Sequence, residues 1–545
     1  MAAGTHWAGY AGGCHCIIQK KDAIGMRMPW LKRENQLPAG KGGLPKMPIK
    51  LFRGVIGGMI TILIVGCSVG PDYTKPNIPV PNRWSTRELP SKAGHAGDVQ
   101  SWWTAFNDPV LTQLIEMATK GNLDVRQAIA RIDESRALVQ AATGRHFPEL
   151  GASGSVLRGK LSENAIGISV PGGMSIETVT ETTYSIGMSS AWEIDLFGRI
   201  RRTVEAASAN YQASIEDFHS VLVALTAQVA AAYIDYREYQ HRLVLARERL
   251  NDIEKLRDLV AKRVEAGIAS KVELSDVESK VAETKAQLPM LQNGLVVSRN
   301  RLCALLGLPP GSIDDVLREV RSIPAPPQEV LVSIPTEVVR QRPDIRKAER
   351  RLAAQTAMIG VRVADLYPRF SLLGSFSFSS LSVSTLLESA SLGFNFGPTL
   401  TWNIFKGGVV RAQIKAEEAR TRQALAAYEN TLITAFKEVE NAISTFRKSA
   451  DQLESIKELV RERKRSLSLA EQLYKSGKQD YLSVLTARLA VCAAEEQQLM
   501  QEARIIQSLV MLYRALGGGW SNNSLTTVLA EIQKEQALIE SGRNK

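Results

Sequence analysis

The stretch from Arg199 to Ala266 reads RIRRTVEAASANYQASIEDFHSVLVALTAQVAAAYIDYREYQHRLVLARERLNDIEKLRDLVAKRVEA and contains neither glycine nor proline. A second stretch of 68 residues, Val409 to Ser476, is equally free of both. Because glycine and proline are the residues that interrupt helices, each stretch is predicted to form one helix. At about 1.5 Å per residue such a helix is roughly 100 Å long, against about 11–12 residues for an ordinary helix.

The two stretches belong to an internal duplication. They are offset by 210 positions, and Trp192 with Trp402 and Gly267 with Gly477 repeat at the same offset. A fixed period indicates one duplicated unit. We therefore expect an N-terminal extension and signal at 1–66, a leader at 67–110, a first repeat at 111–310, a linker at 311–335, a second repeat at 336–519 and a C-terminal tail at 520–545.

The net charge of +11 is concentrated at the N-terminus. The first 66 residues hold nine Lys or Arg and two acids, a surplus of +7, which leaves +4 for the remainder and only weak support for nucleic-acid binding. The five cysteines have no spacing that indicates a disulfide framework or a repeated zinc pair. Cys14-His15-Cys16 is better explained as a chance cluster in a removed segment than as part of a metal site.

A secretory signal is predicted immediately before Cys67. The basic segment from Met47 to Arg53 is followed at 54–66 by uncharged, mostly apolar residues, too few for a transmembrane helix. Residues 64–67 resemble a bacterial lipobox, which implies a lipid on Cys67, and Ser68 after it implies sorting to the outer membrane. Met47 is the better candidate start. The alternative for Cys67 is a buried structural cysteine after an apolar strand.

Two β-hairpins are predicted ahead of the long stretches. The segments 150–161, 183–192, 370–378 and 391–402 alternate small polar with apolar residues, a period of two. Ten to twelve residues is the length of the tilted strands in a membrane β-barrel, whose lumen accepts the small polar face and whose lipid side accepts the apolar face. The alternative is a soluble four-stranded sheet.

Four strands cannot close a transmembrane barrel, because the smallest such barrels have about eight strands and sheet edges cannot lie open in hydrocarbon. Several copies of the chain must then contribute. Three copies would supply twelve strands, so the strand number predicts an oligomer.

Each long helix is expected to turn at a glycine, Gly267 or Gly477, into a returning helix of about 39 residues. The returning helix is shorter than the long one, and the difference is close to the length of the preceding helical segment, 122–147 or 343–367. Each long helix should therefore be matched by two shorter helices stacked end to end. A solid coiled-coil bundle is the alternative, although the attached strands favour a hollow cylinder.

Four motifs stand out along the chain: CSVGPDYTKP at 67–76, SWWTAFNDPVL at 101–111, AWEIDLFG at 191–198 and YKSG at 474–477. Together they resemble the TolC-like outer-membrane efflux family, and the resemblance extends from Cys67 to about Gly519. It implies a mainly α fold with a β-barrel portion: a trimer whose twelve-stranded transmembrane barrel continues into a long periplasmic α-helical barrel. It also implies a lipid-anchored exit duct in the outer membrane, docked to a periplasmic adaptor (membrane fusion) protein and an inner-membrane RND-type pump that exports small toxic compounds.

The resemblance places the periplasmic gate and the adaptor contact at the two glycine turns. Relatives carry acids near Gln479 and Thr486, but both are neutral here, which leaves Asp480 as the nearby acid. We hypothesise that Asp480 from three chains converges near the axis and holds the closed state; the alternative is that these charges only solvate a loop. The predicted site residues are Arg263, Glu265, Gly267, Ser270, Tyr474, Lys475, Gly477, Lys478, Gln479 and Asp480.

Hydrolytic, redox and phosphate-binding motifs were not recognisable in the sequence, so an enzyme is not expected, nor a metal or a cofactor other than the covalent lipid on Cys67. Two functional alternatives stay open. One is an outer-membrane duct of a type I protein-secretion system. The other is a lipid-anchored coiled-coil scaffold without a pore.

Overall fold

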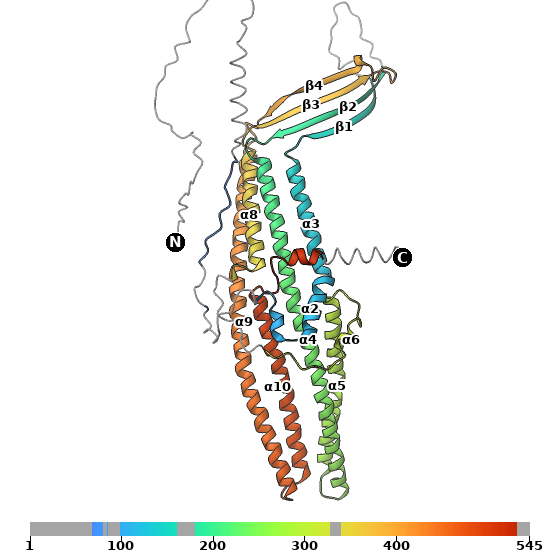
Figure 1. The fold of residues 1–545 in the computed structure, drawn as a ribbon, viewed down its shortest axis with the longest axis vertical. Coiled ribbons are helices and arrows are strands. Elements are labelled where there is room, and N and C mark those ends of the chain that lie inside the picture. Colours follow the sequence, from blue (N-terminus) through green and yellow to red (C-terminus); the bar gives the residue numbers. More distant parts are fainter. Residues whose placement is uncertain (1–67, 80–83, 85–98, 161–179, 327–338, 531–545) are drawn as a thin grey trace, which may run out of the picture. The chain divides into compact units, whose positions relative to one another are not determined.

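The structure is a computed structural model that describes residues 68–79, 84, 99–160, 180–326 and 339–530. Among these residues the chain is mainly helical, with one small β-sheet (Figure 1). The predicted signal and the predicted lipid attachment at Cys67 lie outside the described residues.

The two predicted long helices are confirmed. Helix α4 (Arg199–Glu265) and helix α9 (Val409–Lys475) each have 67 residues, and Figure 1 draws them in green and orange. Each begins directly after a glycine in the left-handed region, Gly198 with φ 77° and Gly408 with φ 83°. These glycines allow the sharp change of direction between a strand and a helix, which a residue with a Cβ would resist.

Four shorter helices accompany them. Helices α5 (Lys271–Leu305) and α10 (Tyr481–Ala515) have 35 residues each, and α3 (Leu123–Gly144) and α8 (Pro343–Ala364) have 22 each. Helix α4 lies against both α3 and α5, and α9 lies against both α8 and α10. The prediction that two shorter helices match each long helix is therefore confirmed.

Helix α4 has more neighbours than its sequence predicts, because it also packs against α8 and α10 of the second repeat. Most of its centre is buried: Val229, Ala230, Ala232, Tyr233 and Ile234 are all 0% exposed, while Gln228 directly before them is exposed. A window of 18 residues in α4 has a mean hydropathy of 1.3, high enough for a membrane span, but 67% of it is buried. This burial is typical of a core helix, and α4 is the element that joins the two repeats.

A compact apolar core lies beside the middle of α4. It includes the 3₁₀ helix η2 (Trp102–Phe106), helix α2 (Pro109–Gly121) and the short helix α6 (Asp314–Leu317). The indole of Trp102 stacks on the ring of Tyr513, with centroids 5.3 Å apart. Trp102 is 1% exposed and Tyr513 2%, so segments far apart in the sequence are fixed to one another here.

The four predicted strands form a single antiparallel sheet in the order β1-β2-β3-β4. They are β1 (Glu149–Lys160), β2 (Thr180–Ile194), β3 (Arg369–Ser380) and β4 (Leu392–Thr401). Their bounds agree with the predicted segments within a few residues. The pairing of β2 with β3 joins the hairpins of the two repeats, which leaves β1 and β4 as the edges of the described sheet.

The strand register gives the sheet two different faces. Phe370 lies opposite Leu400, and Phe376 lies opposite Phe394, so large apolar side chains align across the strands. Phe394 is 79% exposed, where a soluble sheet would bury this face. The apolar face carries Val156, Tyr184, Ile186, Met188, Trp192, Phe370, Leu372, Phe376, Phe378, Leu392, Phe394, Phe396 and Leu400, and the other face carries Gly151, Ser153, Ser155, Ser185, Gly187, Ser189, Ser371, Ser375, Ser377, Gly393, Asn395, Gly397 and Thr399.

The contact between α4 and α5 gives a test of the helix packing. A Cβ added to Gly294 of α5 would lie 2.4 Å from the ring of Tyr239 on α4, so Gly294→Ala must displace this ring from its packed position or push the helices apart. Overpacking costs about 1–3 kcal/mol, more than the roughly 0.5–1 kcal/mol that alanine gains over glycine in a helix. We expect a lower Tm for Gly294→Ala when helical circular dichroism is followed during heating in detergent.

The matched control is Gly144→Ala at the end of α3, where nothing lies within 4 Å of the added Cβ. That variant should melt at or above the temperature of the unaltered protein. Equal melting temperatures for the two variants would contradict the close approach of α5 to α4.

Candidate functional site

Both helical hairpins turn through the same local structure, and we call residues 263–273 and 473–483 around it the tip turns. Gly267 and Gly477 adopt φ values of 70° and 69°. In each turn the glycine N–H donates to the carbonyl three residues back, and the next N–H donates to the carbonyl five residues back, at 2.8 to 3.0 Å. This is the Schellman motif, and it explains why a glycine follows each long helix.

The returning helices begin with side-chain caps. Ser270 Oγ accepts from Glu273 N–H at 3.1 Å while Glu273 Oε1 accepts from Ser270 N–H at 3.2 Å, a capping box. Asp480 Oδ1 accepts from the N–H of Ser483 at 3.1 Å. The acid of the second tip turn therefore holds the start of α10 in place.

Asp480 also joins the two tip turns. Arg263 Nη1 donates to Asp480 Oδ2 at 2.6 Å, between side chains that are 28% and 46% exposed. The Arg263 guanidinium, helped by the backbone and hydroxyl of Ser483, holds the pKa of the Asp480 carboxyl below its usual value. Arg263 and Asp480 were predicted separately as site residues, and the structure shows that they are partners within one chain.

The other predicted tip residues are exposed. Lys475 and Lys478 project from the second turn, and the rings of Tyr474 and Tyr481 approach with centroids 5.3 Å apart. The convergence of Asp480 from three chains concerns other copies and stays a prediction. The exposed predicted residues are Glu265, Gly267, Ser270, Tyr474, Lys475, Gly477, Lys478 and Gln479.

A ladder of polar contacts between α4 and α10 was not anticipated from the sequence. Farther from the tip turns than the pair of Arg263 and Asp480, Arg488 Nε lies 2.8 Å from Asp252 Oδ2, and the Asp252 side chain is only 4% exposed. Farther along, Arg242 Nε lies 3.4 Å from Glu496 Oε1. Asp480 at the N-cap of α10 and positions 488 and 496 within it recur every eight residues. Eight residues turn a helix by about 80° beyond two full turns, so this spacing predicts no stripe along one face.

The ladder lies beside a small apolar cluster that α4, α5 and α10 share. Ile253 and Leu256 of α4 are 1% and 3% exposed, and Leu485 of α10 is 1% exposed. Because these side chains are buried among three helices, separating α10 from α4 would expose apolar surface and leave the buried carboxylate of Asp252 without its Arg488 partner. The full set of buried residues is Ile253, Leu256, Val260, Val277, Val281 and Leu485.

The side chains at this end of the molecule are suited to contact with a partner. Within the described ranges, no group of three or more His, Cys, Asp or Glu side chains is placed to hold a metal ion. The tip turns instead combine exposed charges, paired tyrosines and exposed apolar side chains, of which Ile268 is 68% exposed. Such a surface is suited to a protein partner.

Comparison with known families supplies the identity of this architecture. The profile of the family described as outer membrane efflux protein matches residues 114–308 and 334–518, one segment in each repeat. The chain belongs to the outer membrane efflux protein family. The family resemblance of the four sequence motifs is thereby confirmed.

Relatives in the outer membrane efflux protein family align with this chain over almost their whole length. Nodulation protein T of Rhizobium leguminosarum bv. trifolii is 32% identical over 471 residues, 85% of this chain and 96% of the relative. The toluene efflux pump outer membrane protein TtgI of Pseudomonas putida is 32% identical over 472 residues, 84% of this chain and 97% of the relative. Among solved structures, the outer-membrane channel OprN matches with a TM-score of 0.72 and 34% identity, over 83% of this chain and all of that chain.

The link between the tip turns can be tested by removing either partner. Asp480→Asn keeps a side-chain oxygen for the helix cap but loses the ion pair with Arg263, and Arg263→Gln loses the same pair. An exposed pair contributes at most about 1 kcal/mol, so we expect a wider spread of distances between spin labels on Glu265 and Lys478 and no loss of fold. Because the two single variants remove the same interaction, the double variant should show the same spread of distances as either of them.

The matched control is Arg257→Gln, since Arg257 of α4 pairs with its own neighbour Asp258 at 2.6 Å and links no turns. It should leave the distance distribution unchanged. Broadening of equal size in this control would contradict the link.

The distances between the same spin labels should depend on pH in one direction only. The pKa of Asp480 is lowered from its ordinary value of 3.8, so the stability of the link is present above that value and is lost as the pH falls through the lowered pKa. We expect constant distances from about pH 8 to about pH 5, and broadening only below about pH 4. In Asp480→Asn the spread of distances should be wide at every pH. Broadening near neutral pH in the unaltered protein would contradict the titration of Asp480.

Proposed function

We propose that three copies of this chain form an outer-membrane exit duct. The observation that carries this proposal is the sheet with an exposed apolar face, a small polar face and the two edge strands β1 and β4. In hydrocarbon the edges must be paired, and three sheets of four strands close into a twelve-stranded barrel. The apolar face then meets lipid, and the serine-, glycine- and threonine-rich face lines a water-filled lumen.

The 67-residue helices continue the duct beyond the membrane. Each long helix follows directly from a strand, α4 after β2 and α9 after β4, so the walls of the barrel pass into the walls of a helical barrel. At about 1.5 Å per residue these walls are roughly 100 Å long. This length supports a tunnel through the periplasm, with the tip turns at its far end.

The proposed cargo is small toxic compounds or drugs delivered by an inner-membrane pump of the RND type through a periplasmic adaptor protein. The toluene efflux pump component among the relatives supports an efflux role. The exposed side chains of the tip turns, with Ile268 at 68% and Val272 at 69% exposed, support the tip turns as the surface that meets the adaptor.

The proposed lipid on Cys67 agrees with the position of the residues that follow it. Ser68 lies so close to the turn between β2 and α4 that a Cβ on Gly198 would be 2.9 Å from Ser68 Cα. Val69 N–H donates to Phe197 O at 3.2 Å in the same turn. The leader thus begins at the base of the sheet, where a lipid anchor would enter the inner leaflet of the outer membrane. Mass spectrometry of the mature N-terminal peptide tests this attachment.

The proposed gate is the ring of tip turns. In each chain the link from Arg263 to Asp480 holds the two hairpins together, and the ladder from α10 to α4 supports it. With three chains around the axis, these contacts keep the tips close and narrow the exit. Asp480 is the acid that we place nearest the axis.

The deciding experiment combines gel migration with electrical recording of the purified protein. We expect heat-resistant trimers on a denaturing gel and ion conductance in planar bilayers. Asp480→Ala should raise the single-channel conductance, and the matched control Asp451→Ala, which removes an exposed acid of α9 that pairs with Lys448, should not. A monomer without conductance would instead support a lipid-anchored scaffold, and unchanged conductance in Asp480→Ala would remove Asp480 from the gate.

A further inference from the structure

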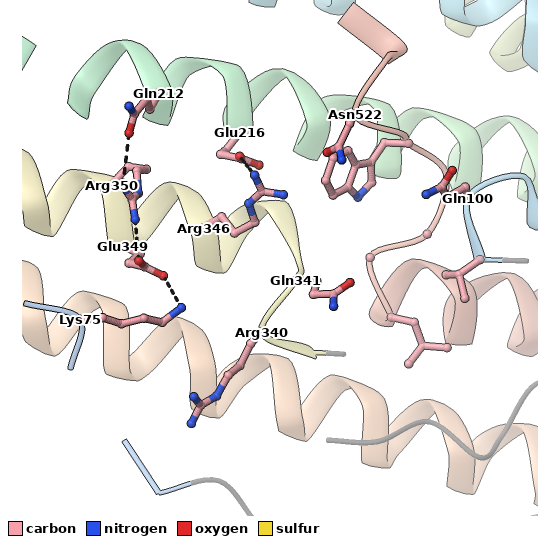
Figure 2. A pocket seen from close by; sticks show the side chains of 15 residues that line it. Lys75, Gln100, Gln212, Glu216, Arg340, Gln341, Arg346, Glu349, Arg350 and Asn522 are labelled. Atoms are coloured by element: carbon pink, nitrogen blue, oxygen red, sulfur yellow. Dashed lines mark hydrogen bonds and ion pairs between the residues drawn. The ribbon is translucent and has the colours of Figure 1, made fainter. Parts of the chain in front are cut away.

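A pocket of about 630 Å³ lies far from the tip turns, beside Gln212 and Glu216 in the first third of α4. The first turns of α8 and the segment that follows α10 form its walls, and Lys75 of the leader reaches its rim (Figure 2). This volume falls within the range of pockets that hold small ligands, about 300–1,000 Å³. The Lys75 side chain is 52% exposed, so the rim is accessible to solvent.

The charges that line this pocket are unbalanced. Three bases, Lys75, Arg346 and Arg350, stand against two acids, Glu216 and Glu349, which is a surplus of one positive charge. A fourth base of the lining, Arg340, donates to Ile78 O at 2.8 Å and adds its positive charge at the edge of the pocket. In a concave site such a surplus is concentrated, because the surrounding protein screens charge less well than water. The lining therefore favours an anion.

The two acids are occupied in holding the bases in place. Glu349 is shared by Lys75 Nζ at 3.1 Å and Arg350 at 2.7 Å, and Glu216 pairs with Arg346 at 2.5 Å. Burial alone would raise the pKa of the Glu349 carboxyl, but Lys75 and Arg350 together keep it below its usual value, so it stays charged. Figure 2 shows Arg350, Glu349 and Lys75 in one line of contacts that crosses α8 toward the leader, with the pair of Arg346 and Glu216 beside it.

The bases are also positioned by neighbours that carry no charge. The Arg346 guanidinium lies 5.4 Å from the ring centroid of Trp520, and the opposing contact of Trp520 is a stack on His219 at 4.2 Å. Arg350 Nη1 donates to Gln212 Oε1 at 3.2 Å. Side chains held in this way lose little further freedom when a ligand binds, which favours affinity.

We propose that this pocket binds a compact anion with two or more negative charges, carried on phosphate or carboxylate groups. The planar fork of arginine matches both groups, and the amide side chains of Gln100, Gln341 and Asn522 in the lining can hydrogen-bond the remaining oxygens. The ligand would touch the leader, α8 and the segment after α10 together, and so would hold these three segments to α4. The proposal concerns one chain and does not depend on the duct.

The test uses isothermal titration of the full-length protein in detergent with two probes, inorganic pyrophosphate and citrate. We expect one site per chain for at least one probe, with affinity that falls as salt is raised. Binding of pyrophosphate alone would assign a phosphate ligand, and binding of citrate alone a carboxylate ligand. If neither probe binds at millimolar concentration in low salt, the proposal is wrong.

Two variants of one ion pair distinguish the effect of pocket charge on affinity from the effect of a loosened fold. Lys75→Gln and Glu349→Gln break the same 3.1 Å contact, but the first lowers the positive surplus of the pocket and the second raises it. We expect Lys75→Gln to weaken binding by about three- to tenfold and Glu349→Gln to strengthen it by a similar factor. General loosening of the fold would weaken binding in both.

The control for total charge is Lys448→Gln on α9, where the side chain is 78% exposed and pairs with Asp451 outside the pocket lining. It should leave the affinity unchanged. Equal weakening in Lys75→Gln and Lys448→Gln, or weakening in Glu349→Gln, would overturn the assignment of this pocket as the anion site.

Discussion

The backbone N–H and C=O groups along the outer edges of β1 and β4 need hydrogen-bond partners, and the rest of the structure depends on this requirement. Each unpaired backbone group in hydrocarbon costs several kcal/mol, so a sheet with this apolar face cannot exist alone in a membrane. In the proposed trimer, pairing between copies would satisfy the edges and would also fix where the next elements start. The helices that follow β2 and β4 would then leave the barrel as a ring, in which long helices pair with shorter ones.

The same constraint explains the unequal roles of α4 and α9. Helix α4 follows an inner strand of the sheet and packs against helices of both repeats, whereas α9 follows the edge strand and packs mainly against α8 and α10. Most of the centre of α4 is accordingly buried. Duplication supplied two similar hairpins, and their positions in the sheet made one of them the core of the chain and left the other at its boundary, where the proposed second copy would lie.

Features set by local chemistry could be predicted from the sequence. The long helices follow from the absence of glycine and proline, the strands from alternation, and the tip turns from Gly267 and Gly477. Features that depend on which surfaces meet could not: the pairing of Arg263 with Asp480, the contact of Asp252 with Arg488 and the packing of α4 against the second repeat. Ion-pair partners lie 217 or 236 positions apart, and no local pattern selects among the many charges on such helices.

The equal length of α4 and α9 limits how this architecture can vary in evolution. Adding one residue to a helix rotates everything beyond it by about 100°, which would turn the buried stripe and the tip turn away from their neighbours. Steps of seven or eleven residues rotate it by only about 20°, so they are the tolerable changes. Both long helices end at linked turns and both returning helices have 35 residues, so a change in one hairpin has to be copied in the other. The reach of the molecule can thus be adjusted only in discrete, paired increments of roughly 10–16 Å.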